Sequence, residues 1–85
     1  MTREELAEMY GDDMLFLTEP YFDDAIMGVV YQCSRPLVCY DVDKIIEILM
    51  KVDKMDEVEA MEYYHFNMVG AYVGENTPVF FEAIL

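Results

Sequence analysis

The stretch AIMGVVYQCSRPLVCYDVDKIIEILMKV, residues 25–52, decides the fold of this 85-residue chain. Residues 25–32 are rich in the β-branched and aromatic types that favour strands. A turn-like segment, 33–36, separates them from a second apolar run, 37–40. We therefore expect an antiparallel hairpin with a loop of about four residues. Both strands are apolar on both faces, which predicts burial on each side or cover from a partner chain.

The end of the same stretch predicts a helix over residues 42–52. Asp41 or Asp43 can cap its first turn, because a carboxylate accepts hydrogen bonds from the free N–H groups there. The apolar residues recur at the spacing of one helix face, and this stripe consists of Ile45, Ile46, Leu49, Met50 and Val52.

A second main helix is predicted from residue 57 to about residue 73. Asp56 is the expected N-cap, and Glu59 stands at the position that completes a capping box. Nearly every face of this helix carries apolar or aromatic groups, which is typical of a deeply buried or interfacial helix. Gly74 follows as a stop signal. The expected core stripe is Val58, Met61, His65, Met68 and Tyr72, widened by Ala60, Tyr64 and Ala71.

The flanking segments complete the fold. Thr2 and Glu5 fit a capping box, which predicts a short N-terminal helix over 3–10. The apolar run 14–17 could be a strand or part of a helix, and residues 18–24 read as a loop. Residues 79–84 suggest a terminal strand.

We expect one domain spanning residues 1–85, of the α+β class. Its sheet is predicted to be small and antiparallel, with three strands or four. The two main helices are expected to pack on one face of this sheet, beside the short N-terminal helix.

The charge balance narrows the function. The chain has 18 acidic and five basic residues, a net charge of -13 and a pI near 4.1, yet 55% of its residues are apolar. Disorder requires low hydrophobicity as well as high charge, so the chain should fold. Strong acidity argues against direct binding of nucleic acid or of an anionic membrane surface. No leader or spanning segment is visible, which suggests an intracellular protein.

The sequence gives little support to a catalytic site or a metal site. Cys33 and Cys39 are expected to be reduced thiols, and their spacing does not fit a zinc site. A small enzyme could pair one of these cysteines with His65, the single histidine, but no local signature favours it. We therefore expect a non-enzymatic protein without a metal or cofactor. Carboxylates that could bind a cation have turn or capping explanations: Asp23, Asp24, Asp41 and Asp43.

Three segments carry a family resemblance: FDDAIMG (22–28), CYDVDK (39–44) and HFNMVGAYVGENTPVF (65–80). Together they resemble small acidic proteins of bacteriophages and prophages. In those proteins a strand ending in Tyr-Asp leads to a helix, and a second helix carries Glu-Tyr-(Tyr/Phe)-x-Phe-Asn before Gly-x-Tyr-x-Gly-x-x-Thr-Pro. The resemblance covers roughly residues 20–81. It implies a phage origin and a location in the host cell cytoplasm.

The acidic residues suggest how such a protein acts. A negative surface can speed docking on a basic groove and block a nucleic-acid site, as a DNA mimic does. We expect an inhibitor of a host defence protein, such as an anti-CRISPR protein, or of a nucleic-acid-processing protein. The alternative reading of the charge is solubility alone. The expected partner-binding residues are Asp53, Asp56, Glu57, Glu59 and Glu62, with Glu4, Glu5 and Glu8.

The aromatic residues suggest a second function class. A short chain with much apolar surface and a large net charge often needs a second copy. We expect a homodimer, and the runner-up function is a homo-oligomeric structural or assembly accessory protein of a phage. Aromatic side chains that fall partly outside the expected core are the predicted self-association residues: Tyr63, Phe66 and Tyr72.

Overall fold

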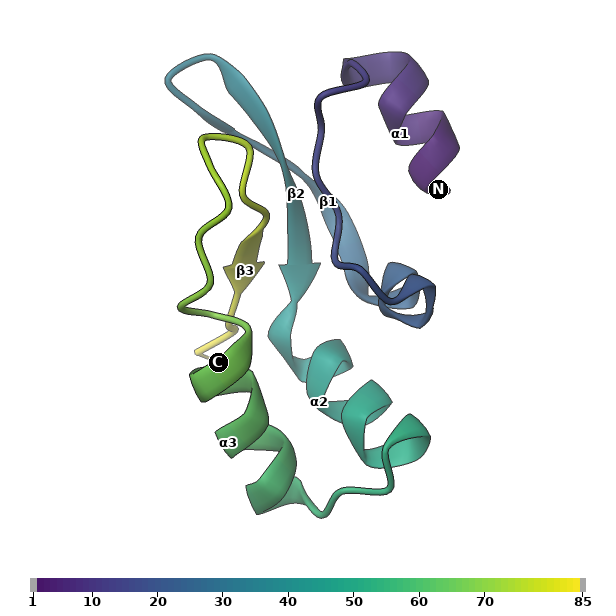
Figure 1. The fold of residues 1–85 in the computed structure, drawn as a ribbon, viewed down its shortest axis with the longest axis vertical. Helices are drawn as coiled ribbons and strands as arrows, with labels where there is room; N and C mark the ends of the chain where they lie inside the picture. The colour runs from purple at the N-terminus through teal and green to yellow at the C-terminus, as the bar shows by residue number, and fades with distance from the viewer. Residues whose placement is uncertain (1, 85) are drawn as a thin grey trace.

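A computed structural model describes residues 2–84, which fold into a three-stranded sheet and several helices (Figure 1). The α+β class is therefore confirmed. The elements in chain order are α1 (Arg3–Tyr10), the 3-10 helix η1 (Pro20–Ala25), β1 (Ile26–Gln32), β2 (Arg35–Asp41), α2 (Val42–Val52), α3 (Glu57–Asn67) and β3 (Val79–Phe81).

β1 and β2 form the predicted antiparallel hairpin, with Gln32 opposite Arg35. The loop between them is shorter than expected, because only Cys33 and Ser34 lie outside the strands. Both residues have positive φ angles, 51° and 69°. This backbone is that of a type I′ turn, whose twist matches the twist of the two strands. The turn is therefore two residues long, and Arg35 and Pro36, which were expected in the loop, belong to β2.

β3 corrects the prediction of an entirely antiparallel sheet. It pairs with β2 in parallel, with Phe80 beside Tyr40 in the strand order β1-β2-β3. Parallel neighbours need a crossover connection, and α2, α3 and residues 68–78 supply it (Figure 1). The sheet is therefore mixed. Within the described chain, residues 14–17 form neither a strand nor a helix, so this run adds no fourth strand.

The last helix, α3, ends at Asn67 and not near residue 73. The Asn67 side chain donates a hydrogen bond to the carbonyl of Tyr63, and the N–H of Val69 reaches the carbonyl of Tyr64. From there the chain runs alongside β3, turns back and enters that strand (Figure 1). A helix continued to residue 73 would rise only 1.5 Å per residue and would use up the residues needed for this return.

The core lies where β2 meets the two main helices, which sit side by side below the ends of β2 and β3 in Figure 1. Val38 and Tyr40 of β2 pack against Ile45 and Leu49 of α2. The buried stripe of α3 differs from the expected one. Its buried members are Ala60 and Tyr64, followed by Met68 just after the helix, whereas the exposed ones are Val58, Met61, His65 and Tyr72.

The start of α3 has the predicted capping box. The Asp56 carboxylate accepts a hydrogen bond from the N–H of Glu59 at 2.8 Å, and the Glu59 carboxylate accepts one from the N–H of Asp56 at 3.1 Å. Two otherwise free backbone donors are satisfied in this way. At α1, Thr2 and Glu5 make the same reciprocal pair. The bond from the Thr2 N–H lowers the pKa of Glu5, so its carboxylate stays ionised to lower pH than that of an ordinary glutamate.

We expect Asp56→Ala to lower the free energy of unfolding by about 1 kcal/mol, because the N–H of Glu59 loses its acceptor. Urea denaturation measures this change. Asp53→Ala is the matched control: it removes the same charge three residues away, and the Asp53 side chain accepts no hydrogen bond in the described chain. Equal losses in the two variants would contradict the capping role.

Arg3 ties α1 to the segment before the sheet. Its guanidinium forms a paired contact with the Asp23 carboxylate, in which Nε lies 2.9 Å from Oδ2. It also donates to the carbonyl of Leu17 at 3.2 Å and lies over the ring of Phe16. The hydrogen bond to Asp23 raises the pKa of Arg3, so the contact favours the charged form that arginine already has across the usual pH range. One side chain thus holds together three chain segments.

We expect Arg3→Ala to cost about 1–3 kcal/mol of unfolding free energy, because Asp23 is left partly buried without its partner. Arg35→Ala is the control, since the Arg35–Glu75 ion pair is more exposed and should contribute less than about 1 kcal/mol. Thermal or urea unfolding compares the two. A larger loss at Arg35 than at Arg3 would refute this ranking.

Candidate functional site

The acidic residues lie on the surface of the described chain. No charged residue is buried there, and three of the 18 acidic side chains form ion pairs: Asp23, Glu75 and Glu47. The basic partners are too few to neutralise the others. Most of the net charge of -13 therefore faces solvent, where it can act on a partner.

Five of the predicted partner-binding residues lie where α2 leads into α3. All five are exposed, but they are not equally free. Asp56 and Glu59 are held by the capping box. Asp53, Glu57 and Glu62 accept no hydrogen bond and form no ion pair within residues 2–84, so their carboxylates remain available for a partner.

The other three predicted residues, Glu4, Glu5 and Glu8, lie on α1 and are also exposed. Figure 1 places α1 and the α2–α3 junction near opposite ends of the long axis. The molecule measures 36 × 27 × 22 Å, and both ends cannot contact one small groove at once. The structure thus divides the predicted acidic face into two separate patches.

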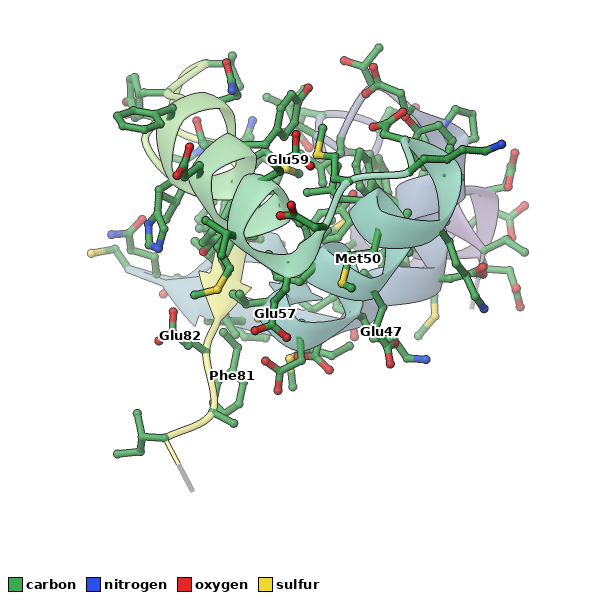
Figure 2. The ribbon with its side chains drawn as sticks, turned by 90° about the horizontal axis from the view of Figure 1, so that it is seen from below. Glu47, Met50, Glu57, Glu59, Phe81 and Glu82 are labelled. Atoms are coloured by element: carbon green, nitrogen blue, oxygen red, sulfur yellow. The ribbon has the colours of Figure 1, made fainter. Side chains whose placement is uncertain are left out.

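A further group of carboxylates shares Glu57 with the α2–α3 junction, but its other members were not among the predicted partner-binding residues. Asp43 and Glu47 of α2, Glu57 of α3, and Glu82 after β3 all line one groove of about 460 Å³. Figure 2 shows Glu47, Glu57 and Glu82 along the same side of the molecule, each from a different segment. The i, i+4 spacing of Asp43 and Glu47 was visible in the sequence. The approach of Glu82 depends on β3 and had no local signal.

The predicted self-association residues are all accessible. Tyr63 is 39% exposed, Phe66 is 84% exposed and Tyr72 is 75% exposed. Tyr63 and Phe66 line a shallow hollow on the outer side of α3 together with Glu59 and Glu62. Tyr72 lies beyond the helix, in the segment that leads to β3. Large apolar groups with this exposure can contribute to a protein interface.

The cysteines and the histidine are dispersed. Cys33 lies in the β1–β2 turn, at the end of the molecule opposite α3, which carries His65 (Figure 1). Cys39 is buried in β2, and burial raises the pKa of its thiol, which disfavours the nucleophilic thiolate. The groove that His65 lines contains no cysteine. This geometry gives no support to a Cys/His enzyme.

Two of the four carboxylates considered as cation ligands, Asp41 and Asp23, have other contacts. Asp41 caps α2 by accepting a hydrogen bond from the N–H of Asp43, and Asp23 is paired with Arg3. Among residues 2–84, no group of three or more His, Cys, Asp or Glu side chains is arranged to hold a metal ion.

Comparison with known proteins gave no match to a family model, to a curated protein or to a solved structure. In the part of the chain that the structure describes, no helix combines the length and the apolar character needed to cross a bilayer. We therefore infer the function from the fold and from the surface of the chain.

Proposed function

We propose that this protein is a non-enzymatic interaction protein that binds a basic surface of another protein through its acidic side chains. The observation that carries this proposal is the exposed and largely unpaired acidic charge of the described residues. Such a surface attracts a basic partner over a distance of about 10 Å at ordinary ionic strength and speeds its docking.

In its most concrete form, the protein is a phage inhibitor in the host cytoplasm. The resemblance to small acidic phage proteins supports this form, together with the small size of the chain. The partner is then a host defence protein, such as a CRISPR complex, or a nucleic-acid-processing protein. Its Lys- and Arg-rich groove normally binds phosphates, and the carboxylates occupy it as a DNA mimic would.

The test is affinity capture from bacterial lysate at about 50 and 300 mM salt, followed by competition with duplex DNA for the captured protein. We expect a basic nucleic-acid-binding protein that is retained at low salt, is released at high salt and is displaced by DNA. Capture that is equal at both salt concentrations and is not reduced by DNA would refute the proposal.

Two charge-reversal variants locate the binding patch. Asp53, Glu57 and Glu62 are changed to Lys in one, which spares the capping box of α3. Glu4, Glu8 and Asp12 are changed to Lys in the other, so the two variants have equal net charge. A larger loss of capture in the first variant assigns binding to the α2–α3 junction, and a larger loss in the second assigns it to α1. Undiminished capture in both variants would also refute the proposal.

A second candidate function is a homo-oligomeric assembly accessory protein of a phage, in which the charge serves solubility. The exposure of Phe66, next to Tyr63 on the same side of α3, favours it. Analytical ultracentrifugation at micromolar concentration tests this function. We expect a dimer that Phe66→Ser converts to a monomer. A monomeric wild-type chain would exclude this candidate.

A further inference from the structure

The groove between α2, α3 and the segment after β3 has an apolar floor inside an acidic rim. Met50 and Met61 are 39% and 47% exposed, and they line the groove with Ile46 and the more deeply buried Tyr64. Figure 2 shows Met50 close to Glu47 and Glu57 on the face where these carboxylates gather. Methionine side chains are flexible and adapt to apolar partners of different shapes.

The rim has one sign of charge. Among residues 2–84, its four carboxylates belong to Asp43, Glu47, Glu57 and Glu82, and no lysine or arginine lines the groove. One of the four, Glu47, has an ion-pair partner in the described chain, Lys44 at 3.5 Å, and both of these side chains are mainly exposed. An exposed pair of this kind gives way easily to a competing cation.

We propose that this groove binds a basic amphipathic segment of the partner protein, with its apolar side chains on the methionines and its Lys or Arg side chains on the rim. An amphipathic helix in an apolar groove is a common form of recognition, and it combines apolar contact with charge complementarity. A second copy of this chain fits poorly, because it brings a net charge of -13 to an acidic rim. The inference rests on the proposed function and specifies what the protein recognises in its partner.

The test uses two labelled 18-residue peptides of Leu and Lys with the same composition. One places all Leu on a single helical face, and the other is scrambled. Fluorescence anisotropy measures their binding to the full chain and to E47Q/E82Q. The matched control is E19Q/D24N, which removes two exposed charges outside the groove, one just before η1 and one within it. A further variant, M61Q, removes apolar surface without changing charge.

We expect the amphipathic peptide to bind more tightly than the scrambled one. E47Q/E82Q should weaken binding of the amphipathic peptide about tenfold, and E19Q/D24N less than about twofold. M61Q should weaken binding of the amphipathic peptide about fivefold and leave binding of the scrambled peptide unchanged. Circular dichroism verifies that each variant is folded, since all substituted side chains are exposed.

Two results would overturn the inference in different ways. Equal binding of both peptides, with equal effects of the two double variants, would mean attraction by net charge alone. The groove would then have no special role, while the proposed function would stand. Absence of binding by both peptides at about 20 mM salt would contradict the groove and the proposed function together, because screening is weak there.

Discussion

Tyr40→Ala lowers the free energy of unfolding by about 3–5 kcal/mol, which is much of the total stability expected for a small domain. Tyr40 is fully buried, at 0% exposure, in the central strand of the sheet. Its ring lies 5.9 Å from the ring of Phe80, which in turn contacts Tyr64 of α3. Loss of the ring opens a cavity where β2, β3 and α3 meet.

The hydroxyl of Tyr40 makes a separate contribution. It accepts a hydrogen bond from the N–H of Leu17 at 2.9 Å and so fixes the segment that leads from α1 to the sheet. Tyr40→Phe keeps the ring and leaves this N–H without its acceptor, at a cost of about 1–2 kcal/mol.

Urea unfolding of both variants separates the contribution of the ring from that of the hydroxyl. Tyr72→Ala is the control, because Tyr72 is mostly exposed and its loss should change stability by less than about 0.5 kcal/mol. A Tyr40→Ala variant as stable as the control would show that Tyr40 does not join the three elements.

Local signals in the sequence predicted local structure well. The capping boxes of Thr2 with Glu5 and of Asp56 with Glu59 were correct, because each depends on residues three positions apart. The helix over 42–52 was also correct, and Ile45 and Leu49 of its predicted stripe are buried, whereas Met50 and Val52 are exposed. Non-local pairing had no such signal, and the parallel placement of β3 was therefore missed.

The apolar stripe of α3 shows a different limit. This helix carries apolar groups on all sides, so periodicity alone cannot select the side that packs. Ala60 and Tyr64 face the core, whereas Val58 and Met61 lie on other sides of the helix and remain exposed. The groove was missed for the same reason, because it required Met61 at the surface.

Only part of the acidic site could be predicted from the sequence. The predicted residues of the α2–α3 junction are exposed and adjacent, as charge clustering indicated. The grouping of Glu82 with Glu47 and Glu57 depends on where β3 enters the sheet, a position that no local pattern encodes.

Alkaline pH destabilises the protein, because three protonated groups are buried in the native state. Burial raises the pKa of Tyr40 and of Tyr64 above the ordinary 10.0, and it raises the pKa of Cys39 above the ordinary 9.0. The carboxylate of Glu82 further raises the pKa of Tyr64. The folded chain thus holds these protons more tightly than the unfolded chain, and it must lose stability where the unfolded chain releases them first.

The sign of these shifts sets the pH range. A raised pKa gives stability that is fully present below the unfolded pKa and is lost as the pH rises through the folded pKa. We expect the free energy of unfolding to be level from about pH 7 to pH 8.5, and then to fall by up to about 1.4 kcal/mol per pH unit for each group. Cys39 acts first because its ordinary pKa is the lowest of the three, and the two tyrosines follow.

Urea unfolding at intervals from pH 7 to pH 10.5 measures this loss, and two variants assign it. Cys39→Val removes the group that titrates first, so the decline should begin at higher pH. Tyr40→Phe should make the decline above pH 10 less steep, because one proton fewer is released on unfolding. A free energy of unfolding that stays constant to pH 10.5 would mean that all three groups ionise equally in the folded and unfolded states, which contradicts their burial in the folded chain.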